Sequence, residues 1–216
     1  MESLEAELER ARDLDPAALA DAIESIGFEC TRCGACCTGH GDDEHTATLF
    51  PDEVRALQNA TDEAWRDVAR PVPFGLDEDG TGETFEWSLQ TDDCGDCTFY
   101  EETDGMGACT VHEDRPLVCQ TYPFSVALGG TSQPMGEAVD EEGMVRAHEC
   151  EGLGRDISRE AAEDLAAALK ERAVRELEEA IAVRENYEPV DVGPGETVVH
   201  DSEGPKRPDG SRLDGR

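Results

Sequence analysis

The stretch Phe28-Glu-Cys30-Thr-Arg-Cys33-Gly-Ala-Cys36-Cys37 places four thiols within eight residues. A Cys-x2-Cys turn lets two sulfur atoms point at one metal ion, and a third thiol at the same interval is typical of runs that bind iron–sulfur clusters. Neighbouring thiols such as Cys36 and Cys37 tend to diverge, which favours either two ions or one shared polynuclear cluster. Because packing does not explain this spacing, we interpret the stretch as a metal-binding motif.

The remaining cysteines support the same interpretation. There are nine in all, and the N-terminus is acidic, without the basic start and apolar run of a signal peptide. We therefore expect a cytoplasmic protein, in which clustered cysteines are more often metal ligands or redox groups than disulfides. The five that follow the motif are Cys94, Cys97, Cys109, Cys119 and Cys150.

The pattern around these cysteines predicts an α+β protein. We expect a small, metal-centred domain of short strands and loops, flanked by an N-terminal helical hairpin and a long C-terminal helix. The predicted segments are a helical segment over 1–27, the cysteine domain over 28–154, a helix over 155–187 that packs on the domain, and a flexible acidic tail over 188–216.

Local signals predict individual elements. Asp15 can cap a helix that begins at Pro16, and Gly27 can end it. Leucines and alanines spaced by four predict the strongest helix over 158–186. Further expected elements are a strand over 46–50, helices from Pro51 and over 61–69, strands over 84–89, 98–100, 109–111 and 124–128, and Asp-Gly turns at 79–80 and 104–105.

Acidity is the second strong signal. The chain has 52 acidic and 18 basic Lys and Arg residues, a net charge of −34, and lysine only at Lys170 and Lys206. Its distributed acidity resembles that of haloarchaeal proteins, in which salt screens self-repulsion. This charge excludes sequence-independent binding to nucleic acid and opposes binding to an anionic membrane. Leu, Ile, Val and Phe make up only about 18% of the chain, a composition near disorder, so metal–thiolate bonds would have to organise the fold.

The motif at 28–37 resembles the CxxCxxCC signature of the YkgJ-type cysteine-cluster family, whose domain is regarded as zinc- or iron-chelating. The run from Cys97 to Tyr100, the run from Gly107 to Phe124 that contains Arg-Pro and Tyr-Pro-Phe, and the closing Cys150-x-Gly152 are similar to later motifs of that family. The resemblance spans residues 28–154. His112 and Gln120 depart from it, since Tyr and Arg are common at these positions.

The resemblance implies eight metal-ligating cysteines, while Cys94 has no counterpart in the pattern and its role stays open. The implied metal is Zn²⁺ or iron, the latter alone or as an iron–sulfur cluster, and the eight thiols suit two tetrahedral sites or a cluster with a second metal. The implied ligands are Cys30, Cys33, Cys36, Cys37, Cys97, Cys109, Cys119 and Cys150.

Two other side chains are expected beside the metal. Thiolates bring more negative charge than the ion cancels, so they need nearby donors, and Arg115, fixed by Pro116, is the best candidate. Tyr122 begins a Tyr-Pro-Phe run that we expect to pack beneath the site. The acidic stretch 40–45, with His at both ends, is an alternative place for a hard cation, although a solvated loop is favoured.

These observations support a metal-binding cysteine-cluster protein. Its expected partners are a metal ion and, as an open alternative, another protein. An alternative is an enzyme, because the CxxCxxCC domain is similar to that of flagellin lysine N-methylases. We find no nucleotide-binding glycine loop, however, and no catalytic residue is assigned. A second alternative is a redox or metal-delivery protein in which Cys94 and Cys97 form an exchangeable pair.

Overall fold

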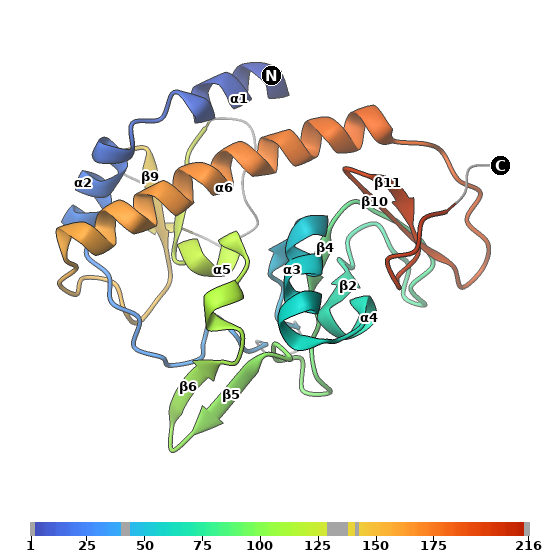
Figure 1. The fold of residues 1–216 in the computed structure, drawn as a ribbon, viewed down its shortest axis with the longest axis horizontal. Coiled ribbons are helices and arrows are strands. Elements are labelled where there is room, and N and C mark those ends of the chain that lie inside the picture. The colour runs from blue at the N-terminus through green and yellow to red at the C-terminus, as the bar shows by residue number, and fades with distance from the viewer. Residues whose placement is uncertain (1–2, 40–43, 129–137, 141–142, 214–216) are drawn as a thin grey trace. The chain divides into compact units, whose positions relative to one another are not determined.

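The computed structural model describes residues 3–39, 44–128, 138–140 and 143–213. It divides into two compact units. We call unit 1 the residues 1–36, 103–107 and 117–178, and unit 2 the residues 37–102, 108–116 and 179–216. Helices and small sheets occur in both (Figure 1), which confirms the predicted α+β class.

Unit 1 begins with the predicted helical hairpin. Helix α1 (Leu4–Arg12) is capped by Ser3, whose hydroxyl accepts a hydrogen bond from the Ala6 amide. Helix α2 (Pro16–Ile26) starts after Asp15, whose carboxylate accepts from the Ala17 amide, and it ends at Gly27 with φ of 79°. Capping residues at the expected positions thus set both ends of α2.

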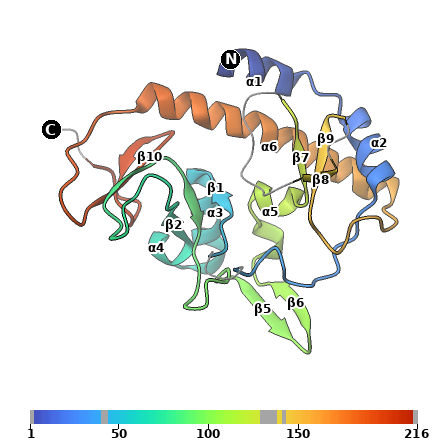
Figure 2. The ribbon, with the colours of Figure 1, turned by 180° about the vertical axis from the view of Figure 1, so that it is seen from behind.

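The longest helix, α6 (Arg159–Asn186), confirms the prediction of a long C-terminal helix. Small and branched side chains at helical spacing are buried along it, and Ala162, Ala166 and Leu169 are fully inaccessible. Lys170 Nζ donates to the Leu14 carbonyl at 2.7 Å. Figures 1 and 2 both show the first half of α6 beside α2, where Arg159 forms ion pairs with acidic side chains of that helix.

A three-stranded antiparallel sheet and a short helix complete unit 1. The strand order is β7 (Phe124–Val126), β9 (Val145–His148) and β8 (Ala138–Asp140). Helix α5 (Leu117–Thr121) precedes β7 and carries Cys119. The predicted strand over 124–128 is therefore present in shorter form.

Unit 2 contains a sheet covered by two helices. Its strands lie in the order β1 (Thr48–Leu49), β4 (Trp87–Leu89) and β2 (Ala69–Pro71). Helices α3 (Pro51–Thr61) and α4 (Trp65–Val68) pack with it, so the helix expected over 61–69 is reduced to four residues. The rings of Trp65 and Trp87 meet edge to face, with centroids 5.1 Å apart, and centre this core.

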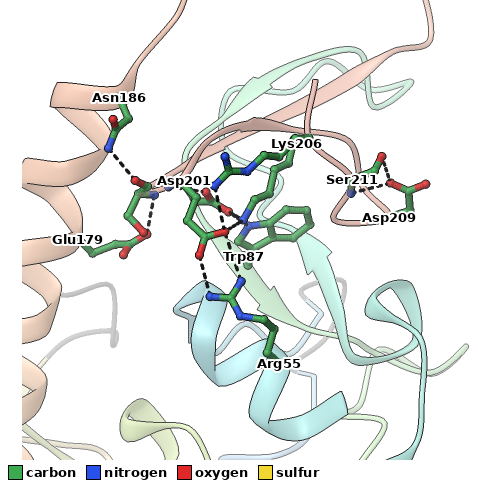
Figure 3. Close-up of polar contacts among 11 residues, drawn as sticks. Arg55, Trp87, Glu179, Asn186, Asp201, Lys206, Asp209 and Ser211 are labelled. Atoms are coloured by element: carbon green, nitrogen blue, oxygen red, sulfur yellow. Dashed lines mark hydrogen bonds and ion pairs between the residues drawn. The ribbon is translucent and has the colours of Figure 1, made fainter. Parts of the chain in front are cut away.

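A second sheet in unit 2 corrects the prediction of a flexible tail. Strands β10 (Thr197–Asp201) and β11 (Gly204–Lys206) form an antiparallel hairpin, and β3 (Gly82–Thr84) pairs with β10 in parallel. Val199, His200 and Lys206 are buried. Figure 3 shows Lys206 among Asp201, Arg55 and Trp87. The Gly, Pro and acidic residues that suggested disorder instead form tight turns and an ion-pair network.

The remaining elements are short. Strands β5 (Tyr100–Thr103) and β6 (Met106–Cys109) form a hairpin around the predicted turn at Asp104-Gly105, and a 3₁₀ turn, η1, covers His112–Asp114. The strand predicted over 84–89 is interrupted, because β3 ends at Thr84 and β4 begins at Trp87 in another sheet. Among the described residues, no helix has an apolar stretch long enough to cross a lipid bilayer.

Candidate metal centre

All nine cysteines lie in described residues, and the structure contains each of them as a thiol rather than in a disulfide. They divide between the two units at the peptide bond between Cys36 and Cys37. Unit 1 contains Cys30, Cys33, Cys36, Cys119 and Cys150, and unit 2 contains Cys37, Cys94, Cys97 and Cys109.

The stretch that carries the first three thiols is irregular. Arg32 has φ of 57° and Gly34 has φ of 79°, both in the left-handed region. These conformations keep the chain between Cys30 and Cys36 out of helix or strand. The Arg32 carbonyl accepts a hydrogen bond from the Gly107 amide at 2.8 Å, which fixes the loop at its middle.

Cys150 lies on a segment that pairs with the residues just before Cys30. The Glu29 amide donates to the Gly152 carbonyl at 3.0 Å, and the Gly154 amide donates to the Gly27 carbonyl at 3.0 Å. A β-carbon at residue 152 would lie 2.2 Å from the Glu29 carbonyl oxygen. Only glycine permits this approach, which gives a structural reason for the Cys-x-Gly sequence at this point.

The electrostatics of Cys150 agree with this pairing. Burial raises the pKa of its thiol, and the neighbouring thiols of Cys36, Cys33 and Cys30 raise it further, while a hydrogen bond from the Gly152 amide lowers it. That amide lies 3.4 Å from Cys150 Sγ. A backbone N–H directed at sulfur is the type of contact that stabilises a metal-bound thiolate.

Tyr122 belongs to the same neighbourhood. Its hydroxyl donates to the Glu149 carbonyl. Burial raises the pKa of Tyr122 to about 12, and negative charge on Cys150, Cys36, Glu149 and Cys33 adds to the shift. Two residues later, Phe124 is fully buried, and its ring meets that of Phe28 edge to face with centroids 5.8 Å apart. The Tyr-Pro-Phe run thus packs against the start of the cysteine motif.

Three of the unit 2 thiols belong to segments whose backbones are hydrogen-bonded to one another. The Cys97 amide donates to the Cys37 carbonyl at 2.8 Å. The Thr110 amide donates to the Phe99 carbonyl at 2.9 Å, and the Tyr100 amide donates to the Cys97 carbonyl at 2.9 Å. These bonds bring Cys37 and the residue pair 109–110 to the turn that contains Cys97.

Cys94 lies on the loop that leads into this turn. Its amide and that of Asp96 both donate to Asp92 Oδ1, at 2.8 and 3.1 Å. The Asp92 amide in turn donates to the Asp96 carbonyl at 2.8 Å, and residues 91 and 97 form a β-bridge. The loop over 92–97 is therefore fixed by local hydrogen bonds, and its two cysteines stand at the Cys-x2-Cys interval.

The predicted donor Arg115 lies in unit 2, where its Nε donates to the His112 carbonyl at 2.9 Å.

In unit 1 a different arginine, Arg172 of α6, is buried beside α5. Its Nη1 donates to Thr121 Oγ1 at 3.0 Å, and its Nε donates to Glu176 Oε1 at 2.7 Å. Sequence reasoning missed Arg172, because a basic residue beside an apolar helical stripe is usually exposed.

The donor chemistry of these residues fits zinc or iron, because thiolates are preferred ligands of both. Within the described part of the chain, however, no three Cys, His, Asp or Glu side chains already stand close enough together to hold a metal ion. Backbone hydrogen bonds nevertheless bring cysteine-bearing segments together within each unit. Most of the alternative acidic stretch at 40–45 lies outside the described residues.

Comparison with known protein families identifies the cysteine-rich part of the chain. The family model CxxCxxCC, described as "Putative zinc- or iron-chelating domain", matches residues 29–151, more than half of the chain. No curated protein and no solved structure matches this chain. The matched range begins one residue before the first cysteine of the motif and ends one residue after Cys150. The chain therefore belongs to the CxxCxxCC family.

Proposed function

We propose that this protein binds zinc or iron through eight cysteine thiolates, and that the metal stabilises the folded cysteine domain. The ligands are those that the family pattern implies: Cys30, Cys33, Cys36, Cys37, Cys97, Cys109, Cys119 and Cys150. When bound, the metal supplies cross-links between loops that have little apolar core of their own.

One observation carries the proposal. Cys150, more than a hundred residues from the motif in sequence, lies on a segment that is hydrogen-bonded to residues 27–29, directly before Cys30. The chain folds so that distant cysteines return to the motif, which packing of apolar surface alone does not require. The thiols of Cys36, Cys33 and Cys30 lie near enough to Cys150 to raise the pKa of its thiol, which supports the same conclusion.

Positive charge and polar hydrogens near the thiolates would offset the negative charge of the ligand set. In unit 1 the Gly152 amide lies 3.4 Å from Cys150 Sγ, and the Tyr122 hydroxyl donates to the carbonyl of Glu149, the residue before Cys150. Arg115 is the candidate in unit 2. Each would orient or neutralise a ligand rather than bind the metal itself.

The test is elemental analysis of the native protein, purified without oxygen, together with measurement of acid-labile sulfide. We expect zinc or iron in at least stoichiometric amount. Iron with sulfide and a visible charge-transfer absorption would identify an iron–sulfur cluster, and zinc without sulfide would identify tetrahedral thiolate sites. A chain without bound metal would contradict the proposal.

A further inference from the structure

We propose that the cysteines form two separate metal-binding sets, one in each unit, divided at the Cys36–Cys37 peptide bond, and that Cys94 is a ligand of the second set. This inference rests on the proposed function. The first set is Cys30, Cys33, Cys36, Cys119 and Cys150, and the second is Cys37, Cys94, Cys97 and Cys109.

The first set is supported by backbone pairing inside unit 1. Residues 27–29 are hydrogen-bonded to residues 152–154, which brings Cys30 and Cys150 to neighbouring positions. Tyr122, three residues after Cys119, donates to the carbonyl of Glu149, the residue before Cys150. The motif, the closing Cys-x-Gly and the helix with Cys119 therefore converge within one unit.

The second set is supported by an independent group of backbone bonds inside unit 2. The Cys97 amide donates to the Cys37 carbonyl, so Cys37 lies beside the turn at 97–100. The Gly39 amide donates to Asp96 Oδ1 at 2.9 Å, which fixes the chain after Cys37 to the same loop. Cys109 reaches this turn through the pairing of Thr110 with Phe99.

The number of thiols in unit 2 indicates that Cys94 is a ligand of the second set. Without Cys94, unit 2 has three cysteines, one fewer than the four protein ligands of a closed thiolate site for zinc or of a four-iron cluster, whereas unit 1 has five and needs no further thiol. Cys94 is the remaining cysteine of the unit, and it stands at the Cys-x2-Cys interval from Cys97 on a loop held by Asp92. This interval lets two sulfurs point at one ion.

The experiment uses the wild-type, metal-loaded full chain under anoxic conditions. Thiols are alkylated with N-ethylmaleimide at increasing EDTA concentration, and the labelling of each cysteine is followed by mass spectrometry together with the metal that remains bound. We expect two groups of cysteines, each of which becomes reactive as a unit while its own share of the metal leaves. Cys94 should become reactive together with Cys37, Cys97 and Cys109.

Variants give a second readout. Cys36→Ser and Cys37→Ser change neighbouring residues, so they serve as controls for each other, and their metal losses should be complementary and add up to the whole in the double variant. Cys94→Ser should lose the same share of the bound metal as Cys37→Ser. Asp93→Ser, a substitution in the same loop, should lose no metal.

The outcomes separate this inference from the proposed function. If all thiols become reactive together, or if Cys36→Ser and Cys37→Ser lose the same metal, the chain has one shared site and the division is wrong. If Cys94 reacts at once while Cys37, Cys97 and Cys109 stay protected, Cys94 is not a ligand and is available for thiol exchange. If the wild-type chain has neither metal nor protected thiols, the proposed function itself fails.

Discussion

Lys206 and Asp201 form a buried ion pair. Lys206 Nζ lies 2.7 Å from Asp201 Oδ2, and each side chain is only 2% exposed. Asp201 Oδ2 also accepts a hydrogen bond from Trp87 Nε1 at 2.8 Å, and Lys206 Nζ lies 5.2 Å from the centre of the Trp65 ring. One of the two lysines in the chain is thus used to join the hairpin β10–β11 to the tryptophan core of unit 2 (Figure 3).

Replacing Lys206 by Met should strongly destabilise unit 2. The change leaves the Asp201 carboxylate buried without its cation, and losing one member of a buried pair typically destabilises by about 3–5 kcal/mol. Urea unfolding followed by tryptophan fluorescence measures the effect. Arg12→Met, which breaks the half-exposed pair with Glu178, is the control and should change the midpoint little. Equal effects of the two substitutions would show that the Lys206 pair has no special role.

Glu203 should make stability depend on pH in a defined window. A hydrogen bond from Arg55 is the largest cause that lowers the pKa of Glu203 to about 2 from 4.5, with Lys206 contributing and burial opposing. Because the folded-state pKa is the lower one, the stabilisation is fully present above about pH 4.5 and is lost as pH falls towards 2.

The difference in unfolding midpoint between the wild type and Glu203→Gln should therefore be constant above pH 4.5 and shrink below it. Comparing the two proteins removes the contribution of thiol protonation and metal release, which both share. The exposed Glu113→Gln is the control. A difference that grows as the pH falls would refute this role of Glu203.

Gly152→Ala should separate the Cys150 segment from the motif without removing a thiol. The new β-carbon would lie 2.2 Å from the Glu29 carbonyl oxygen. The backbone would have to shift to remove this clash, and such overpacking typically destabilises the folded state by about 1–3 kcal/mol. Faster hydrogen exchange at the amides of Glu29 and Gly154, together with lower metal content, is the expected result. Glu151→Ala changes an exposed neighbour and should behave as wild type. Unchanged exchange in Gly152→Ala would contradict the close approach.

Arg172→Met should loosen α5. The substitution removes the hydrogen bonds to Thr121 Oγ1 and Glu176 Oε1, and a buried polar group left without its partner costs about 1–3 kcal/mol. Hydrogen exchange over residues 117–121 should become faster, whereas the exposed Arg184→Met on the same helix should leave it unchanged. If α5 stays equally protected in both variants, Arg172 does not hold it in place.

The elements with local signals were predictable. Pro16 after a capping aspartate, Gly27 in the left-handed region and the four-residue spacing along α6 act within a few residues, so the sequence reveals them directly. Strands β10 and β11 were not predictable from the sequence. Their stability comes from pairing with β3 and from the Lys206 network, and these contacts join residues far apart in the chain.

The site shows the same division. The motif at 30–37 and the Cys-x2-Cys interval at 94–97 are local patterns, and they indicated metal chemistry at once. Such patterns do not predict which thiols lie near one another, since this depends on long-range bonds such as that between the Cys97 amide and the Cys37 carbonyl. Arg172 escaped notice because a basic residue near an apolar helical stripe is usually exposed, and only burial against Thr121 reveals its role.

We propose that the cysteines hold a metal on which the cysteine domain depends. The most direct measurement is the metal content per chain of anoxically purified wild-type protein, compared with a variant in which Cys30, Cys33 and Cys36 are all serine, with hydrogen exchange recorded on both. We predict bound zinc or iron in the wild type, a clear loss of metal in the variant, and faster exchange over residues 27–30 and 150–154. Equal metal content and equal exchange in the two proteins, or a wild-type chain without metal, would contradict the account.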